Sequence, residues 1–401
     1  MRILMLGWEL PPHNSGGLGM VCYQMCRALA KKGADIEFIL PYKADHGISF
    51  MKITAAHPQG VSEILKSGIA YDSYKYKFTD GHIETHDIYS QVHMYEQAVA
   101  QLVVNRQFDV IHAHDWLTFR AALRAKQMAK CPIVLHVHSI ERDRAGGAEG
   151  NPLCREIEGI SLMLADRVIA VSEHTKQMII EDYGIPAGKI EVVHNSIEPD
   201  DMEPLDDDNA YHYLSAMRGL GYRVVVAVSR LTVQKGLPNL LHAAKEVVKR
   251  EPKTLFLIVG SGEQYFELLR LAADLGIATN VIFTGFQRGK RWRDAYSSAD
   301  LFVMPSVSEP FGITALEAVG YGTPALVTNQ SGVAEVLRNC LKVDFWDINE
   351  MANQITAVIQ NDSLRDTLHS NAHHEFESMS WSHAADKLLG IYDDHKVGAY
   401  V

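Results

Sequence analysis

The stretch that most constrains the fold lies between residues 301 and 324, where a short apolar run precedes a polar loop and a segment with helical spacing. Leu301–Met304 predicts a buried strand, because Asp300 precedes it and prolines and serines follow it. From Gly312 onward the apolar residues recur at helical spacing until a Gly-Tyr-Gly sequence ends the helix. A strand, a tight loop and a helix in this order form the repeating unit of an α/β protein with a parallel sheet.

Two carboxylates stand at the two ends of this turn, Glu309 in the loop and Glu317 inside the helix. The first backbone amides of a helix have no partner within it, so the amides of residues 311–314 can bind an anion or a hydroxyl group. An ordinary strand–helix turn with a solvated Glu is the alternative. The loop favours a ligand site, because it combines Ser, Glu, Pro, Phe and Gly where a turn needs only one or two of them.

Composition restricts the class of protein. The chain has 401 residues, of which 47% are hydrophobic and 22% are charged, enough for two globular domains of ordinary size. The net charge of -11 and the lack of a basic block exclude the electrostatic footprint of a nucleic-acid-binding protein. Five scattered cysteines, no apolar run of about 18 residues and no signal peptide predict a cytoplasmic enzyme with reduced thiols and no stable membrane insertion.

The N-terminal stretch repeats the strand–loop–helix pattern. Ile3–Leu6 predicts a strand, a loop with Gly16 and Gly17 follows, Met20–Lys31 has helical periodicity, and Ile36–Leu40 predicts the next strand. This βαβ unit indicates a doubly wound parallel sheet. A dehydrogenase that binds NAD is an alternative on the same kind of sheet, but the glycine spacing is not that of G-x-G-x-x-G.

Two further predicted strands end in pairs of histidines, His112 with His114 and His136 with His138. Ligands bind outside the carboxyl ends of parallel strands, so both pairs lie where a site is expected. A metal centre is the alternative. We expect at most one histidine of each pair to face the site, with no carboxylate or Cys as a third ligand, and therefore predict no metal ion.

The second half of the chain contains two candidate cations. The β-rich run at 222–228 predicts the first strand of a second domain, and the loop that follows holds Arg230 and Lys235. An Arg fork and a Lys charge on one strand-end loop can neutralise a diphosphate. Two ordinary surface cations are the alternative. Asp206 and Asp208 match a D-x-D metal motif, but their acidic run indicates a solvated linker.

Several of these strings resemble one family. Glu309 and Glu317 enclose seven residues within Ser-Glu-Pro-Phe-Gly-x4-Glu-Ala, and Gly-Thr-Pro follows. This resembles the E-x7-E signature of retaining glycosyltransferases with the GT-B fold, in particular family 4 and its glycogen-synthase-like members. The Arg-x4-Lys-Gly string at 230–236 and the His-Asp-Trp string at 114–116 resemble motifs of the same family. The chain departs from bacterial starch and glycogen synthases at Asn14, where those enzymes carry a lysine.

The resemblance implies an α/β architecture of two Rossmann-like, doubly wound domains that face each other across a cleft. We expect an acceptor domain at 1–198, to which a C-terminal helix at 378–401 returns, and a nucleotide-sugar donor domain at 199–377. Residues 43–104 are the least readable part. Their tyrosines and histidines predict a packed insertion more than a sugar-binding platform.

The resemblance also implies the reaction: a hexose, expected to be glucose, passes from a nucleotide-diphosphate sugar such as UDP- or ADP-glucose to the hydroxyl of an α-glucan or small sugar. Anomeric configuration is retained, and no cofactor or metal takes part. The partners are this donor and a carbohydrate acceptor; the sequence does not determine the oligomeric state, and a homo-oligomer is one of the states it allows. One alternative is a family 4 transferase with a lipid-linked or cell-envelope acceptor. Another is a non-catalytic nucleotide-sugar-binding protein.

The resemblance assigns roles to individual residues. The predicted catalytic residues are Glu309, His114, Arg230 and Lys235. The predicted donor-binding residues are Gly16, Gly17, Arg230, Lys235, Gly260, Phe286, Pro310, Phe311, Gly312, Ile313, Thr314 and Glu317. The predicted acceptor-side residues are His138, Glu141 and Trp116.

Overall fold

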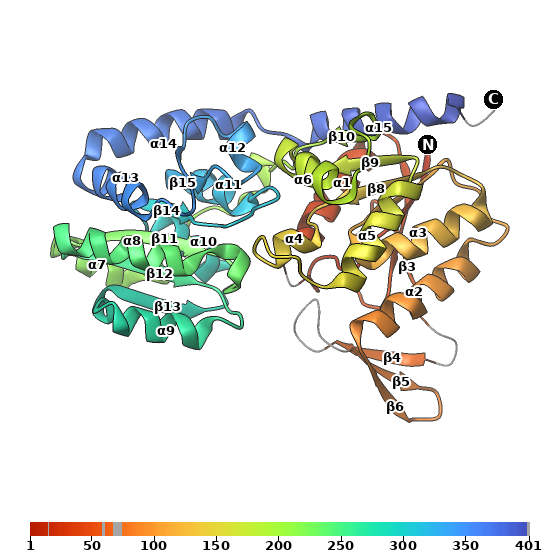
Figure 1. Ribbon diagram of the computed structural model, residues 1–401, viewed down its shortest axis with the longest axis horizontal. Coiled ribbons are helices and arrows are strands. Elements are labelled where there is room, and N and C mark those ends of the chain that lie inside the picture. The colour runs from red at the N-terminus through yellow and green to blue at the C-terminus, as the bar shows by residue number, and fades with distance from the viewer. Residues whose placement is uncertain (15, 58–60, 67–73, 399–401) are drawn as a thin grey trace. The chain divides into compact units, whose positions relative to one another are not determined.

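The computed structural model describes residues 1–14, 16–57, 61–66 and 74–398 (Figure 1). The chain forms two compact units. The first contains Met1–Glu141, Asn151–Asn195 and the chain from Trp381 onward, and the second contains Arg142–Gly150 and Ser196–Ser380. The short segment Arg142–Gly150, which the sequence does not single out, therefore belongs with the second unit.

The first unit is built on a seven-stranded parallel sheet in the order β10-β9-β8-β7-β1-β2-β3. Its strands are β1 (Arg2–Leu6), β2 (Asp35–Leu40), β3 (Lys52–Ala55), β7 (Val110–His114), β8 (Ile133–Val137), β9 (Arg167–Ala170) and β10 (Ile190–Val192). The chain winds outward from β1 in one direction and from β7 in the other. The switch point of the topology, where ligands bind in open α/β sheets, therefore lies between β1 and β7.

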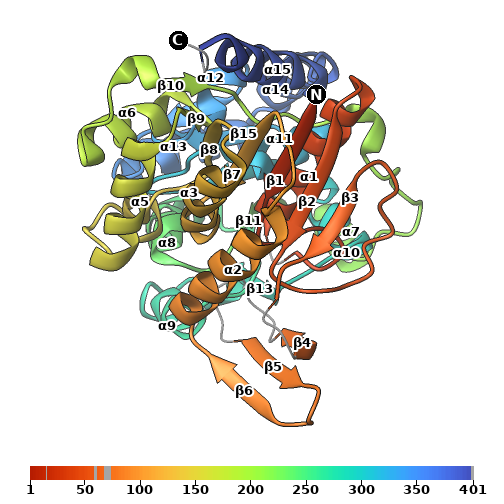
Figure 2. The ribbon, with the colours of Figure 1, turned by 90° about the vertical axis from the view of Figure 1, so that its right-hand side faces the viewer.

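Helices cover both faces of this sheet. They are α1 (Gly17–Lys31), α2 (Ile88–Val103), α3 (Trp116–Ala129), α5 (Pro152–Leu164), α6 (Glu173–Tyr183) and α15 (Trp381–Gly398), with the short η1 (Ala187–Lys189). The short α4 (Glu141–Arg144) begins at the last residue of the first unit before Arg142–Gly150 and lies mostly in the second unit. Figure 2 shows α2 and α3 in front of the strands. Leu4 and Leu6 of β1 pack in the cluster that includes α2 and α3, while Ile3 and Met5 pack in the one that includes α1 and α15. Alternate residues of one strand thus supply two cores.

A small antiparallel sheet lies between β3 and α2 in the chain and at the lower edge of the first unit in Figure 1. Its strands are β4 (Val61–Lys66), β5 (Tyr74–Phe78) and β6 (Ile83–His86). Tyr76 is 2% exposed and joins the core of the unit, as the prediction of a packed insertion requires. Tyr71 lies outside the described residues.

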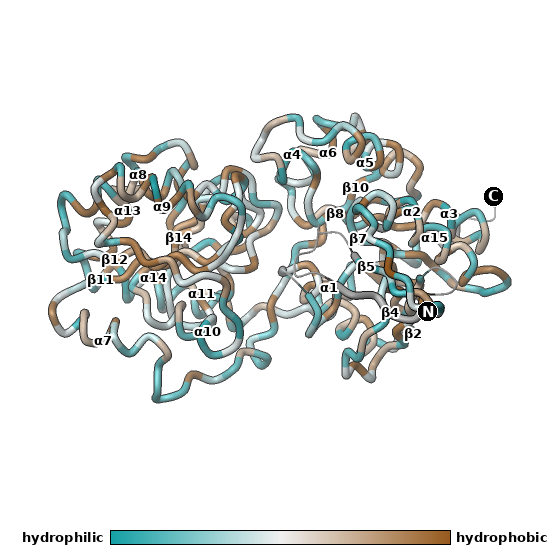
Figure 3. Tube along the Cα trace, turned by 90° about the horizontal axis from the view of Figure 1, so that it is seen from below, coloured by the Kyte–Doolittle hydropathy of each residue, from teal (hydrophilic) through white to brown (hydrophobic). Residues whose placement is uncertain are grey.

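The second unit has a six-stranded parallel sheet in the order β13-β12-β11-β14-β15-β16. Its strands are β11 (Arg223–Val228), β12 (Thr254–Val259), β13 (Val281–Gly285), β14 (Leu301–Met304), β15 (Ala325–Thr328) and β16 (Leu341–Val343). Figure 3 shows the apolar residues concentrated along the central strands, in keeping with burial on both faces. The switch point of this sheet lies between β11 and β14.

Helices surround this second sheet. They are α7 (His212–Gly219), α8 (Leu237–Arg250), α9 (Tyr265–Asp274), α10 (Lys290–Ser297), α11 (Ile313–Gly320), α12 (Val333–Val336), α13 (Ile348–Gln360) and α14 (Asp362–Glu377), with the short η2 (Pro199–Asp201), η3 (Val233–Lys235) and η4 (Ala278–Asn280). The two parallel sheets confirm the predicted doubly wound α/β architecture. Within the described residues, none of the helices is both long and apolar enough to cross a membrane.

Candidate functional site

The loops at the carboxyl edge of the second sheet are tied directly to one another. The amide of Leu231, after β11, donates to the carbonyl of Ser261, after β12, at 2.9 Å. The amide of Val307, after β14, donates to the carbonyl of Gln234 at 2.9 Å. The loops after three neighbouring strands therefore form one backbone-bonded layer at the switch point.

Two glycines make this close approach possible. Gly260 has φ +146°, and a Cβ there would lie 1.8 Å from the carbonyl oxygen of Ser229. Gly236 has φ +61°, and a Cβ there would lie 2.0 Å from the carbonyl oxygen of Pro305. A side chain at either position would push the loops apart, so the glycines set the shape of this edge. Gly260 was predicted to contact the donor. The structure shows that a glycine is needed there in any case, because a Cβ would clash with the carbonyl oxygen of Ser229.

Glu309 and Lys235 form an ion pair, although the sequence assigned them to different parts of a ligand. Nζ of Lys235 lies 2.6 Å from Oε2 of Glu309, and Oγ of Ser306 donates to the same oxygen at 3.0 Å. Both side chains are largely buried, at 14% and 12% exposure. The backbone of Glu309 is fixed as well, because its amide donates to the carbonyl of Gln330 at 2.9 Å.

The amino end of α11 comes directly after the loop that holds Glu309. Gly312 has φ +103°, and a Cβ there would lie 2.7 Å from Cε of Met304, so a larger residue would displace the start of the helix. Within the described part of the chain, no acceptor is bonded to the amides of Gly312, Ile313 and Thr314. Pro310 and Phe311 are buried beneath this end. The helix therefore presents free donors and a positive dipole end beside the Lys235–Glu309 pair.

Glu317 lies about one turn inside α11. It accepts a hydrogen bond of 2.8 Å from the hydroxyl of Tyr296 on α10, a partner for which the sequence carries no local signal. Burial raises the pKa of Glu317 to about 7, and the bond from Tyr296 only partly opposes this. The carboxyl group can therefore both donate and accept hydrogen bonds near neutral pH.

The other predicted donor contacts of the second unit are exposed. Arg230 is solvent-exposed and forms no ion pair with any residue that the structure describes. Phe286, at the carboxyl end of β13, is 55% exposed, and Cζ of Arg288 lies 5.2 Å from the centre of its ring. A free guanidinium and an open aromatic face are thus available on the same edge of the sheet as Gly260.

The four histidines of the first unit lie together on one face of β7 and β8, which contradicts the expectation that only one of each pair faces the site. The ring centres of His112 and His114 are 4.6 Å apart, and those of His136 and His138 are 4.2 Å apart. Nδ1 of His114 and Nε2 of His138 are hydrogen-bonded at 2.9 Å. The expectation was wrong because residues two apart on a strand point to the same side.

Burial keeps these imidazoles neutral. It lowers the pKa of His112 and of His138 to about 3, and it lowers those of His114 and His136 well below the usual value. Nε2 of His114 is buried without a hydrogen-bond partner. His114 thus offers a neutral ring with an unused nitrogen at the carboxyl end of β7.

Cys22 of α1 also reaches this cluster. One nitrogen or sulfur atom from each of Cys22, His114 and His138 lies within 4.8 Å of the other two, and the same holds for His112, His114 and His136. The expectation that no cysteine accompanies the histidines was therefore wrong. Its cause is tertiary, because α1 and β8 are brought together only by the folding of the sheet.

The remaining predicted residues of the first unit have mixed surroundings. Gly16 and Gly17 are exposed at the amino end of α1, where a ligand can approach the backbone. Trp116 is 2% exposed and packs in the core, with its ring centre 5.8 Å from that of Tyr89. The prediction placed Trp116 on the acceptor side, whereas in the structure its side chain is not accessible to an acceptor. Glu141 accepts from the amide of Asn151 at 2.8 Å and so supports a loop.

The D-x-D motif before α7 is held by cations of α10. Asp206 pairs with Arg293 at 2.7 Å and with Lys290 at 3.1 Å. These contacts lower the pKa of Asp206. The motif is thus an ion-paired segment rather than a freely solvated linker, and its first carboxylate already has two partners.

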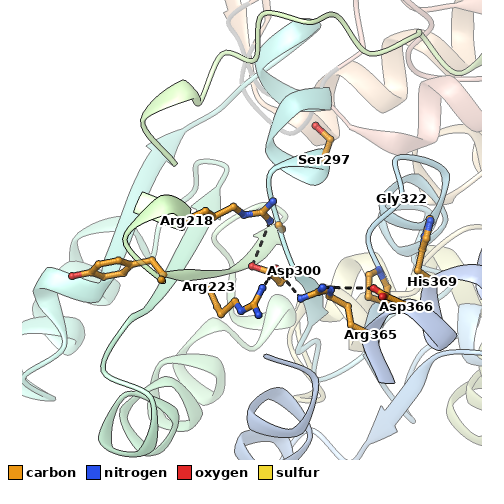
Figure 4. A pocket seen from close by; sticks show the side chains of 12 residues that line it. Arg218, Arg223, Ser297, Asp300, Gly322, Arg365, Asp366 and His369 are labelled. Carbon is orange, nitrogen blue, oxygen red and sulfur yellow. Dashed lines mark hydrogen bonds and ion pairs between the residues drawn. The ribbon is translucent and has the colours of Figure 1, made fainter. Parts of the chain in front are cut away.

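A pocket of about 470 Å³ lies at the opposite, amino edge of the second sheet (Figure 4). At its centre Asp300 pairs with Arg218 at 3.4 Å, Arg223 at 3.5 Å and Arg365 at 3.3 Å. Asp300 also accepts from the amide of Val224 at 2.8 Å. This network joins strand starts to α14 and is separate from the loops that hold Glu309.

Two family models match the chain. The model for glycosyl transferases group 1 matches residues 218–375, and the model for glycosyltransferase family 4 matches residues 15–201. The first match contains the Lys235–Glu309 pair, and the second contains the four histidines. Together the two models include most of the chain, the switch point of the second sheet and β7 at the switch point of the first.

Curated relatives are similar over most of their length. An uncharacterised glycosyltransferase of Methanocaldococcus jannaschii is 29% identical over 98% of this chain and 98% of its own. A D-inositol 3-phosphate glycosyltransferase of Rhodococcus opacus is 27% identical, over 94% of this chain and 86% of its own. A glycogen synthase of Mycobacterium tuberculosis is 28% identical, over 84% of this chain and 80% of its own.

Solved structures share the fold. Sucrose-phosphate synthase from Thermosynechococcus elongatus has a TM-score of 0.74 at 19% identity, over 98% of each chain. HepE of Anabaena in complex with UDP-glucose has a TM-score of 0.69 at 20% identity, over 98% of this chain and 100% of that one. With these likenesses and the two family matches, the chain is a glycosyltransferase of the GT-B fold and belongs to the glycosyl transferases group 1 family.

Proposed function

We propose that this glycosyltransferase moves glucose from a nucleotide-diphosphate sugar, UDP-glucose or ADP-glucose, to a hydroxyl group of an α-glucan or small sugar, with retention of configuration and without a metal ion. The observation that carries the proposal is the arrangement around Glu309. Arg230 and the first amides of α11, which have no partner among the residues that the structure describes, share one edge of the second sheet with the Lys235–Glu309 pair.

The leaving diphosphate needs positive charge as its bond to the sugar breaks. Arg230 has no ion pair with the described residues and can form a fork with two phosphate oxygens. Lys235 supplies a second charge from the same loop, and the amides of Gly312 and Ile313 supply fixed dipoles. Groups held in place before reaction stabilise developing charge without reorganisation.

Glu309 has the complementary task. A carboxylate can hold sugar hydroxyl groups and favour the positive charge of an oxocarbenium-like transition state. Its contacts with Lys235 and Ser306 hold the carboxylate in one orientation. When a donor diphosphate attracts Lys235, the Glu309 oxygen that Lys235 now contacts is released toward the sugar hydroxyls.

Residues on the same edge of the second sheet can bind the ribose and the base of the nucleoside. We assign the ribose hydroxyls to Glu317, whose carboxyl group has a pKa near neutrality and can both donate and accept. We assign the base to the exposed ring of Phe286 and to the backbone at Gly260, where the missing Cβ leaves the carbonyl of Ser229 accessible. From the family resemblance we assign the Gly16–Gly17 amides of the first unit to the diphosphate and its His114 to the sugar and the acceptor.

The choice of donor and acceptor class follows the similar proteins. The Anabaena structure contains UDP-glucose, and the named curated relatives act as a glycogen synthase and a D-inositol 3-phosphate glycosyltransferase. Retention follows from the family resemblance, in which the acceptor attacks on the face of the leaving group and a phosphate oxygen takes its proton. The Arg230 and Lys235 charges and the α11 amides can carry the diphosphate by themselves, which is why we propose a metal-independent transfer.

A donor panel tests the proposal. The purified protein is given UDP-glucose, ADP-glucose, UDP-galactose or GDP-mannose with maltose-type or inositol-type acceptors, and release of the nucleoside diphosphate is measured. We expect the glucose donors to turn over fastest and Glu309→Gln to abolish most of that release. Turnover of a non-glucose donor alone would overturn the sugar assignment, and turnover unaffected by Glu309→Gln would overturn the site.

A further inference from the structure

The thiol of Cys22 and two imidazoles are grouped in the interior of the first unit. Cys22 is 1% exposed on α1 and His114 is 1% exposed at the end of β7, whereas His138, directly after β8, is half-buried. One ligand-type atom of each lies within 4.8 Å of the other two. We propose that Cys22, His114 and His138 bind a transition-metal ion of the Zn²⁺ class, and that this ion regulates the enzyme rather than taking part in sugar transfer.

The chemistry of the three groups suits such an ion. Thiolate sulfur and imidazole nitrogen are the ligands that Zn²⁺ prefers, whereas Mg²⁺ and Ca²⁺ prefer oxygen. Three protein ligands leave one tetrahedral position for a water molecule, and solvent reaches the group on the side of the half-buried His138.

The spacing requires only small movements of the histidines. Two nitrogens that each lie about 2.0 Å from a tetrahedral Zn²⁺ are about 3.3 Å apart. Nδ1 of His114 and Nε2 of His138 are 2.9 Å apart and share a proton. An ion in place of that proton would separate the rings by a few tenths of an ångström, and Sγ of Cys22, within 4.8 Å of a nitrogen of each ring, would be the third ligand.

The surrounding charge distinguishes this triad from the other histidine group. A buried divalent ion needs negative charge nearby. A Cys22 thiolate would supply one charge, and the carboxylate of Asp115 supplies another beside the triad, because the amide of His138 donates to Oδ1 of Asp115 at 2.7 Å.

The second triad lacks this compensation. His112, His114 and His136 also lie within ligand distance of one another, but this group contains no thiol that could supply a negative charge. Nδ1 of His112 is in addition hydrogen-bonded to the hydroxyl of Tyr392 on α15, which leaves one nitrogen for a metal. A divalent ion bound to His112, His114 and His136 would leave its two positive charges uncompensated in a buried site.

The regulatory consequence rests on the proposed function, because it requires His114 to contact the sugar and the acceptor. An ion bound to Nδ1 of His114 would fix the ring proton on Nε2, so the nitrogen left for the substrate could donate a hydrogen bond but not accept one. We therefore expect Zn²⁺ to inhibit transfer and a chelator to restore it. Metal binding itself is measured without substrate, so failure of the transfer assignment and failure of the metal site give different results.

Cobalt spectroscopy of the full-length protein tests the site. Metal-free wild-type protein is titrated with Co²⁺, and we expect one equivalent to give visible bands of four-coordinate cobalt and a near-ultraviolet thiolate-to-cobalt band. Cys22→Ser should remove the near-ultraviolet band, and His138→Gln should weaken binding by about 10²-fold or more, since even outer-shell partners of a metal contribute about 10–100-fold. Cys26→Ser is the matched control, because Cys26 is buried one turn further along α1 and belongs to neither triad.

Thermal unfolding guards against misfolded variants. Each variant is first shown to unfold cooperatively in EDTA, and the midpoint is then measured with one equivalent of Zn²⁺. We expect the ion to raise the midpoint of the wild type and of Cys26→Ser but not that of Cys22→Ser, since a ligand stabilises only the state that binds it. Lack of one-to-one binding by the wild type, or a thiolate band that survives Cys22→Ser, would overturn the proposal. Loss of the metal in His112→Gln with retention in Cys22→Ser would do so as well.

Discussion

Nζ of Lys235 lies 2.6 Å from Oε2 of Glu309, so the side chain assigned to the diphosphate and the side chain assigned to the sugar are in contact with each other. Both are largely buried, and neither can be removed without leaving the other uncompensated. The pair is fixed by a bond from Ser306 and by the backbone of Glu309. The first prediction follows from this contact.

Lys235→Ala and Glu309→Gln should not have independent effects. Each single change should lower kcat/KM by roughly 10²-fold or more, the scale for loss of a group that stabilises developing charge. The double variant should lose far less than the product of the two, because the second change removes a group that the first has already disabled. Steady-state kinetics of the four proteins give the coupling. Effects that multiply would show that the contact has no part in catalysis.

Arg230 should contribute to catalysis without contributing to stability. It is exposed and has no ion pair with the described residues, so Arg230→Ala should leave the free energy of unfolding within about 0.5 kcal/mol of the wild type. kcat/KM should fall by roughly 10²-fold. Arg270→Ala on α9 is the matched control, since Arg270 is also exposed and pairs only with Asp274 of the same helix. Equal rates for Arg230→Ala and the control would remove the diphosphate assignment.

Substitutions of Glu309 and Glu317 should affect different kinetic parameters. Glu309→Gln keeps the size of the side chain but loses its charge, so kcat should fall strongly while the Kd of the donor stays within a few-fold. Glu317→Gln should instead weaken donor binding, with a smaller change of kcat at saturating donor. Calorimetry and steady-state rates on the same preparations separate the two effects. The opposite result would exchange the two roles.

Glu317 should also make stability depend on pH. Burial raises its folded-state pKa to about 7, above the ordinary value of 4.5, so the folded protein binds a proton that the unfolded chain releases. This group therefore removes stability as pH rises from about 4.5 to about 7, by at most about 3 kcal/mol. Urea unfolding at pH 5 and pH 8 measures it. The stability of Glu317→Gln relative to the wild type should increase with pH, whereas a constant difference would contradict the shift.

Chelation should not stop transfer. If Arg230, Lys235 and the amides of α11 carry the diphosphate, activity with a glucose donor should persist in excess EDTA. It should rise if the protein carries inhibitory zinc at Cys22, His114 and His138. Nucleoside diphosphate release before and after chelation is the measurement. Abolition of activity that Mg²⁺ or Mn²⁺ restores would show that a metal carries the leaving group instead.

Local patterns in the sequence were enough for the strands, the helices and the order in which they occur. The run Leu301–Met304 is β14 as predicted, because an apolar run between a charge and a proline is buried whatever surrounds it. The contacts of the site were not predictable in this way. Lys235 and Glu309 are 74 positions apart, and Tyr296 reaches Glu317 only because α10 and α11 pack together.

The histidine cluster shows a different kind of error. Side-chain direction on a strand can be read from the sequence, and two residues of the same parity belong to the same face. The register of β7 and β8, with His114 opposite His136, then places both pairs in one layer. Cys22 could not have been added from the sequence, since nothing local indicates which strand α1 packs against.

The segment Arg142–Gly150 is part of the second unit but is synthesised before the rest of it, because residues 151–195 of the first unit follow it in the chain. Asp143 is completely buried and accepts a hydrogen bond from Ser308, the residue just before Glu309, across 165 positions of the chain. Gly146 lies against Val233, two residues before Lys235. During synthesis from the amino end, both residues of this segment emerge long before the loops they contact. A fragment that begins at Ser196 would contain every predicted donor-binding residue of this unit and still lack the Asp143 carboxylate that accepts from Ser308.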